Sequence, residues 1–146
     1  MKIIVFLVAI VVSAIGQMLA TVNAHAAQSV ITAAQVNGTW RSQHGELKIW
    51  ALGKQRLRVK FSGIYEYSSL YGPMANTGEG AGIAVIEGDT AVFKPDDTDA
   101  ECRITIQFME NGLNVGQDGI CGFGHNVSAA GAYRKISGRK PKFDLD

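Results

Sequence analysis

Hydrophobic and polar residues alternate with a period of two in several short segments between residues 38 and 137. In the clearest segment, residues 55–61, three apolar side chains share one face and three basic side chains share the other: Leu57, Val59 and Phe61 against Arg56, Arg58 and Lys60. Residues 102–108 alternate equally well. Because successive side chains of a strand point to opposite faces, these segments predict strands with one buried face.

Glycine-containing turn signals separate the expected strands. The pattern predicts strands at 39–43, 46–51, 55–61, 64–70, 80–86, 90–94, 102–108, 113–115 and 131–136. Asn111-Gly112 predicts a two-residue hairpin turn, because both positions tolerate a positive φ. Further turns are expected at 52–54, 87–89 and 118–119. Only residues 29–36 suggest helix, as a short turn with Ser29 as its cap.

About eight short strands with short connections predict an all-β fold. Short loops make neighbouring strands antiparallel, and an up-and-down meander removes its exposed edges by closing into a barrel. The 17 glycines suit the tight turns and bends that closure requires. A two-sheet sandwich is the alternative. We expect this domain to span residues 27–137, followed by a polar C-terminal tail, residues 138–146, outside the core.

The first 26 residues have the pattern of a secretory signal peptide. Lys2 precedes an apolar run from Ile3 to about Ile15, and the segment ends Ala24-His25-Ala26. This order predicts cleavage before Ala27, with cleavage after Ala24 as the alternative. No cysteine lies at the junction, so we expect no lipid anchor. The expected product is a periplasmic or secreted chain without a stable membrane anchor.

The charge balance argues against nucleic-acid binding, and the cysteine content indicates a disulfide. The chain has 14 Lys and Arg against 13 Asp and Glu, and losing Lys2 would leave it neutral. A neutral chain has no field that would recruit nucleic acid. Cys102 and Cys121 are the only cysteines. In an oxidising compartment they predict one disulfide, with two buried free thiols as the alternative.

Residues 33–40 combine a short helical turn with a Gly38-Thr39-Trp40 entry into the first strand. This resembles the opening of lipocalin-like barrels, in which the tryptophan closes one end of the barrel. The resemblance implies a basic residue near the last strand that packs over the ring, and Arg134 is the candidate for that cation–π contact. A strand that merely begins with a buried tryptophan is the alternative.

Two further resemblances concern exported proteins. The stretches 74–79, 102–106, 121–127 and 131–135 resemble a group of small exported bacterial proteins of mostly unassigned function. Ser62-Gly63-Ile64-Tyr65-Glu66-Tyr67 is similar to the Ser-Gly-x-x-Tyr loop that periplasmic lysozyme inhibitors place in the enzyme's cleft. The tyrosine spacing differs by one residue in each direction, and the Thr-Lys-Gly ending of that family's second motif is absent. A strand edge with ordinary tyrosines is the alternative.

These observations predict a binding protein and not an enzyme. No catalytic or paired metal motif occurs, and the acidic segment 96–101 lacks the spacing of a calcium loop. We therefore expect no cofactor and no metal. The first hypothesis is an inhibitor of a cell-wall hydrolase such as lysozyme, which contacts its partner through a set of five residues: Ser62, Gly63, Tyr65, Tyr67 and Tyr71. Tyr65 and Tyr67 share a face, which in most strands is core.

Two alternatives to the inhibitor stay open. One is a carrier of a small apolar ligand in the barrel, with a bulky predicted lining: Trp40, Leu57, Val59, Phe61, Ile104, Ile106 and Phe108. Bulky residues of this kind suggest a filled interior, because a barrel of eight strands holds a ligand only when its lining is loosely packed. The other alternative is a structural envelope protein without a discrete site.

Overall fold

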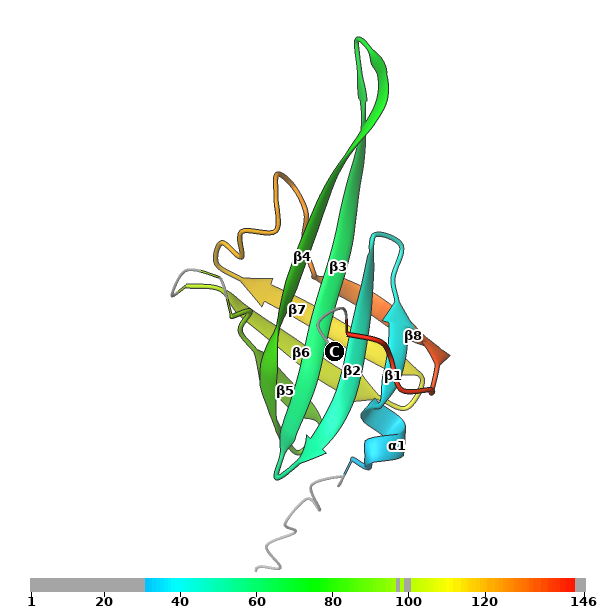
Figure 1. Ribbon diagram of the computed structural model, residues 1–146, viewed down its shortest axis with the longest axis vertical. Coiled ribbons are helices and arrows are strands. Elements are labelled where there is room, and N and C mark those ends of the chain that lie inside the picture. The colour runs from blue at the N-terminus through cyan, green and yellow to red at the C-terminus, as the bar shows by residue number, and fades with distance from the viewer. Residues whose placement is uncertain (1–30, 97, 99–100, 144–146) are drawn as a thin grey trace, which may run out of the picture.

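The computed structural model describes residues 31–96, 98 and 101–143, so the predicted signal peptide lies outside the described residues. One helix precedes eight strands: α1 (Ala33–Val36), β1 (Gly38–Arg41), β2 (Gly45–Gly53), β3 (Arg56–Ser69), β4 (Gly72–Glu87), β5 (Thr90–Phe93), β6 (Arg103–Met109), β7 (Gly112–Asp118) and β8 (Gly131–Ser137). Each strand pairs antiparallel with the next, and β8 returns to β1 (Figure 1). The predicted closed up-and-down barrel is confirmed.

Apolar side chains of every strand fill the barrel. All seven predicted interior residues are buried: Trp40, Leu57, Val59, Phe61, Ile104, Ile106 and Phe108. Each such side chain contributes about 1.5–3 kcal/mol to folding when it is removed from water. On β3 the basic side chains Arg56, Arg58 and Lys60 alternate with the interior ones and point outward, as the period of two requires.

The strands β3 and β4 are longer than the sequence pattern predicted. The expected strands 55–61 and 64–70 form one strand, because Ser62 and Gly63 continue the ladder opposite Glu79 and Gly78. Residues 72–79, for which no strand was predicted, belong to β4. Glycine lowers strand propensity, but cross-strand pairing along the whole hairpin outweighs that local preference.

The turn between β6 and β7 lies one residue earlier than predicted. Met109 pairs with Gly112, so Glu110 and Asn111 form the two-residue connection and Gly112 is the first residue of β7. The close approach of Tyr133 explains this register, since a Cβ at Gly112 would lie 2.6 Å from the Tyr133 carbonyl oxygen. Gly112 is therefore needed because a side chain would contact the Tyr133 backbone, and not because the turn needs a positive φ.

Helix α1 begins with a capping box and lies at one end of the barrel. Thr32 Oγ1 accepts a hydrogen bond from the Gln35 backbone N–H, and Gln35 Oε1 accepts one from the Thr32 backbone N–H. Two orphan donors of the first turn are thereby satisfied. Thr32 is the cap, and the predicted cap, Ser29, lies outside the described residues.

Lys135, and not Arg134, packs over the Trp40 ring. Its Nζ lies 4.6 Å from the ring centroid and donates to the carbonyl oxygens of Ala34 and Gln35 at 3.0 and 2.8 Å. Trp40 Nε1 donates to the Val36 carbonyl at 3.1 Å. The prediction of Arg134 was wrong because Tyr133 points into the barrel, so alternation turns Arg134 outward and returns Lys135 to the inner side. Partial burial lowers the pKa of the Lys135 ammonium.

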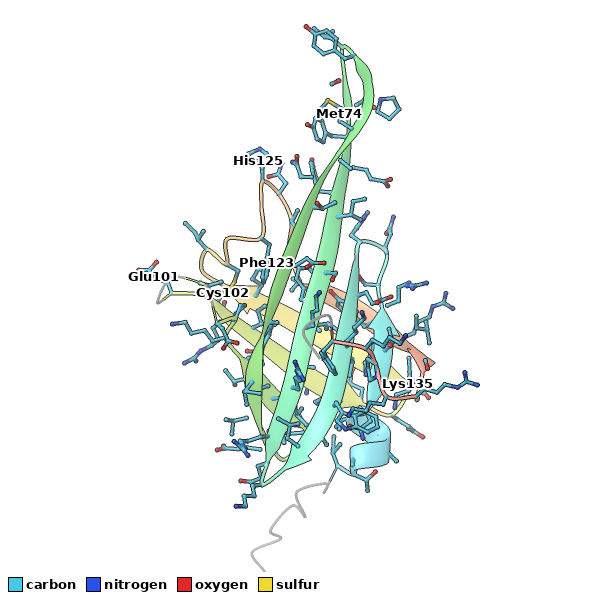
Figure 2. All side chains as sticks on the ribbon, viewed as in Figure 1. Met74, Glu101, Cys102, Phe123, His125 and Lys135 are labelled. Atoms are coloured by element: carbon cyan, nitrogen blue, oxygen red, sulfur yellow. A yellow bond between two sulfur atoms is a disulfide. The ribbon has the colours of Figure 1, made fainter. Side chains whose placement is uncertain are left out.

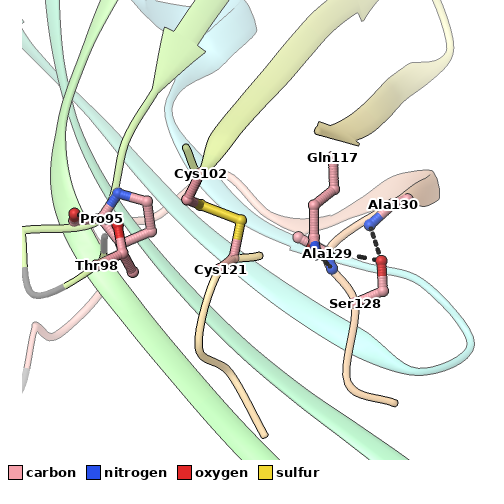
Figure 3. The surroundings of a disulfide bond; sticks show 8 residues. All are labelled: Pro95, Thr98, Cys102, Gln117, Cys121, Ser128, Ala129 and Ala130. Carbon is pink, nitrogen blue, oxygen red and sulfur yellow. Dashed lines mark hydrogen bonds between the residues drawn. A yellow bond between two sulfur atoms is a disulfide. The ribbon is translucent and has the colours of Figure 1, made fainter. Parts of the chain in front are cut away.

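A disulfide joins Cys102 to Cys121, as predicted (Figure 3). It connects the start of β6 to the segment that follows β7, with a Cα–Cα distance of 4.7 Å. Both cysteines are buried in the core cluster. Nearby, Gln117 Oε1 accepts a 2.8 Å hydrogen bond from the Ala129 backbone N–H. The bridge and this bond hold the two ends of the long β7–β8 connection against the barrel.

Residues 138–143 run over the outside of the barrel and do not extend away from it (Figure 1). Phe143 is buried, and the Arg58 guanidinium of β3 lies 4.7 Å from its ring centroid. Lys140 Nζ lies 5.9 Å from the Trp50 ring on β2. The segment is absent from the interior core cluster, but it is not wholly polar, because buried Phe143 covers part of the outer face of β3.

Removal of the disulfide should destabilise the fold. The bridge closes a loop with a sequence separation of 19. In the chain-entropy model, a loop of this size corresponds to about 3 kcal/mol. We expect the double variant Cys102→Ala/Cys121→Ala to lose about that much unfolding free energy in urea titration. An unchanged urea midpoint would contradict the stabilising role of the bridge.

Candidate functional site

The β3–β4 hairpin projects beyond the rest of the barrel (Figure 1). Pairing between β2 and β3 ends at Gly45 and Gly63, and β4 pairs with β5 only from Ala84 onward. The two long strands continue to pair with each other until Ser69 meets Gly72. From Ile64 to the tip this extends about 20 Å, at about 3.3 Å per residue. The result is a two-stranded ribbon, defined here as residues 64–77.

One face of the ribbon continues the core face of β3 above the barrel. Phe61 points into the barrel, so alternation places Tyr65 and Tyr67 on the same side of the strand. Their rings stack at 6.2 Å with an interplanar angle of 22°. The hydroxyl of Tyr67 lies 3.8 Å from Sδ of Met74, its cross-strand neighbour. The prediction of a shared face is confirmed, but the face lies outside the core and Tyr65 is 38% exposed.

The tip of the ribbon presents two apolar side chains to solvent. Leu70 and Tyr71 are 101% and 96% exposed. Ser69 Oγ accepts a hydrogen bond from the Tyr71 backbone N–H and donates to the Gly72 carbonyl, which fixes the turn. Gly72 has a φ of 108°, a conformation that favours glycine. The tip is therefore an ordered turn with an aromatic and an aliphatic side chain fully accessible.

Two facing glycines allow the β7–β8 connection to brace the base of the ribbon. A Cβ at Gly78 would overlap the Phe123 carbonyl oxygen, and one at Gly63 would lie 2.9 Å from Val127 Cγ1. Asn76 Nδ2 donates to the His125 carbonyl at 2.9 Å. Figure 2 shows His125 and Phe123 on this connection beside the ribbon. Packing of the β7–β8 connection against the two glycines thus supports the ribbon on one side.

An open depression lies at the ribbon's base. It has a volume of about 600 Å³ and lies between residues 41–46, which join β1 to β2, and two segments of the hairpin, residues 62–64 and 77–79. Ser62 Oγ lies 3.3 Å from Glu79 Oε1. Glu79 Oε2 lies 3.3 Å from Lys60 Nζ, and Glu46 pairs with Arg41 at 2.7 Å. The two carboxylates of this depression are therefore engaged in ion pairs.

The five predicted contact residues lie along one hairpin but do not form one cluster. Tyr65 and Tyr67 are together, Tyr71 is at the tip, and Ser62 and Gly63 both line the depression. Leu70 and Met74 are also accessible but are not among the five predicted contact residues; Leu70 lies within the predicted segment, and Met74 lies outside it. Met74-Ala75-Asn76-Thr77 has no apolar alternation, so only its pairing with β3 shows that it is a strand.

The described residues contain no cluster of side chains that could hold a metal ion. Within residues 31–96, 98 and 101–143, no three His, Cys, Asp or Glu side chains lie close enough together to hold a metal ion. His44 and His125 are both exposed and lie on separate loops. No helix in the described part of the chain has the length and apolar character needed to cross a membrane.

Fold and ribbon together define a small disulfide-bonded β-barrel that carries a projecting hairpin. Comparison of the chain with protein-family models, with curated proteins and with solved structures finds no match. The geometry of the hairpin is therefore the basis for the functional proposal.

Gly78→Ala should destabilise the protein, because the new methyl group would overlap the Phe123 backbone. Overpacking of this kind costs about 1–3 kcal/mol. Gly116→Ala is the matched control, since its Cβ would meet no atom within 4 Å. Urea titration should show a lower midpoint for Gly78→Ala alone. Equal midpoints for the two variants would contradict the proposed packing at the base of the ribbon.

Proposed function

We propose that this chain is an exported, non-enzymatic binding protein whose β3–β4 ribbon enters a cleft of a protein partner. The observation that carries the proposal is the exposed Leu70–Tyr71 tip at the end of an ordered ribbon. Aromatic side chains dominate the energetics of many interfaces, because they bury a large area with few rotatable bonds. Glu66 is the only charged residue between Phe61 and Gly78, so entry of the ribbon into a cleft would desolvate little charge.

Export is supported by two independent features of the chain. The first 26 residues have the order of charge, apolar run and small residues of a secretory signal. The Cys102–Cys121 disulfide is compatible with an oxidising compartment. We therefore propose a partner in the cell envelope or outside the cell.

A cell-wall hydrolase such as lysozyme is the proposed partner class. Hydrolases of polymeric substrates bind an extended chain in a long cleft, and a two-stranded ribbon is narrow enough to follow such a cleft, since paired strands lie about 4.8 Å apart. The hydroxyl groups of Tyr65, Tyr67 and Tyr71 can donate to the carboxylates that such enzymes use. The similarity of residues 62–67 to the inhibitor loop points to the same partner class.

The barrel interior does not favour a carrier function. Several of the residues that would line a ligand cavity, Val59, Phe61, Ile104 and Ile106, have no surface accessible to water. Interior side chains that leave no room for water leave no room for a larger apolar ligand. Binding is therefore proposed for the outside of the barrel.

Lysozyme inhibition tests the proposal. Purified mature protein at micromolar concentration should slow lysis of bacterial cell walls by at least one class of lysozyme. The double variant Leu70→Ser/Tyr71→Ser should raise the inhibition constant at least about tenfold, which corresponds to about 1.4 kcal/mol of lost contact energy. Both side chains are solvent-exposed, so the unfolding free energy should not change.

Ile120→Ser is the matched control, because Ile120 is 78% exposed and lies outside the ribbon. It should inhibit as the natural chain does. Absence of inhibition against every lysozyme class would contradict the hydrolase as partner. Equal inhibition by the tip variant and the natural chain would contradict the role of the ribbon.

A further inference from the structure

One edge of the ribbon has free backbone hydrogen-bonding groups. In an antiparallel pair, residues alternately direct their N–H and C=O toward the paired strand and away from it. The Ile64 N–H bonds to the His44 carbonyl at 2.8 Å, so Ile64 faces away from β4. The alternation then directs the N–H and C=O of Glu66 and Ser68 away from β4 as well. Among the described residues, no strand lies along this edge beyond His44.

The opposite edge of the ribbon is protected. Pro73 and Ala75 pair with Ser68 and Glu66, so they direct their free groups away from β3. Pro73 has no N–H to offer, and a proline on an edge strand prevents strand addition. Asn76, next in the chain, bonds to the β7–β8 connection. The ribbon thus has one protected edge and one open edge.

The open edge is complementary to itself. It begins after Ile64, where pairing with β2 stops, and it ends at Ser69, where the turn starts, so its centre is Tyr67. Antiparallel pairing of two such edges about Tyr67 places Glu66 of each copy opposite Ser68 of the other. This register forms four backbone hydrogen bonds, with each carboxylate opposite a hydroxyl group instead of a second carboxylate.

We propose that two copies of this chain associate through this edge, defined as Tyr65–Ser69, into a four-stranded antiparallel sheet. Tyr65, Tyr67 and Met74 of both copies would then share one face of that sheet, because side chains of paired residues point to the same side. A two-stranded ribbon is marginally stable in water, and third and fourth strands stabilise it. The ladder is short, so we expect a dissociation constant on the order of micromolar.

The depression at the ribbon's base fits the same arrangement. When Ser69 of the second copy lies opposite Tyr65, the Leu70–Tyr71 tip that follows reaches the level of Ile64 and His44. Both residues line the open depression of about 600 Å³. In the proposed dimer, the exposed Leu70–Tyr71 tip of one copy would thus lie beside the depression of the other copy. The dimer does not depend on the proposed hydrolase partner, but it uses the same hairpin, so the two complexes exclude each other.

Sedimentation velocity tests the dimer on protein exported with its own leader and purified in its mature form. The natural chain should change reversibly from monomer to dimer across micromolar concentrations. Ser68→Pro should weaken association at least tenfold, because it removes an N–H of the open edge. Ser68→Ala, which keeps that N–H, should associate as the natural chain does. Circular dichroism should show the same barrel in all three proteins.

A cysteine cross-link tests the register and is informative even when Ser68→Pro does not fold. Tyr67 lies opposite itself in the proposed dimer, and such pairs have Cα atoms about 4.5 Å apart, within the range for a disulfide. Tyr67→Cys should therefore form a covalent dimer in air, visible on a non-reducing gel. Tyr65→Cys is the control, because the two copies of residue 65 would lie about 13 Å apart along the strands.

Three results would overturn the proposal. They are a natural chain that stays monomeric at the highest concentration, equal association of Ser68→Pro and Ser68→Ala, and equal cross-linking of Tyr67→Cys and Tyr65→Cys. None of these measurements involves a hydrolase, so failure of the dimer and failure of the inhibitor proposal are separate results.

Discussion

Closure of β1 on β8 is the constraint on which the rest of the structure depends. A closed barrel satisfies every strand edge within its height, and here short strands such as β1 and β5, with four residues each, limit that height. The strands β3 and β4 have 14 and 16 residues. Their surplus length has no neighbour in the barrel, so it leaves the barrel as a ribbon.

The ribbon keeps the alternation of the barrel but loses its solvent exclusion. In the barrel, the inner face of β3 carries buried Leu57, Val59 and Phe61. Beyond the mouth, the same face carries Tyr65 and Tyr67, which are partly accessible. Tyrosine suits this position, because its ring packs against a neighbour while its hydroxyl stays hydrated. The transition from core to accessible surface along one strand gives the hairpin its candidate binding face.

The base of the ribbon is held on one side by the β7–β8 connection, as the proposed binding role requires. The Cys102–Cys121 bridge and the close packing of Phe123 on Gly78 hold the β7–β8 connection beside the hairpin. At the far end of the barrel, Trp40, Lys135 and helix α1 close the interior. Because the barrel is filled and closed, it provides a fixed base for the ribbon that extends from β3 and β4. Loops and hairpins held by a rigid scaffold are where proteins most often place binding residues.

The amino-acid sequence by itself determined the fold class, the interior residues and the disulfide. Each follows from a local signal: a period of two, glycine-rich turns, and a single pair of cysteines behind a leader-like segment. Only the tertiary structure decided the extent of β3 and β4. By local propensity Gly63 and Gly78 predict interruptions of the strands, but in the structure they pair with each other within one continuous ladder. It likewise decided that Lys135 covers Trp40, since that depends on which side of β8 faces inward at the barrel's end. The candidate site was predicted as five residues between Ser62 and Tyr71. Their separation along a projecting ribbon with one open edge was decided by where β2 and β5 stop pairing with β3 and β4, and these limits depend on closure of the whole barrel, which no local pattern encodes.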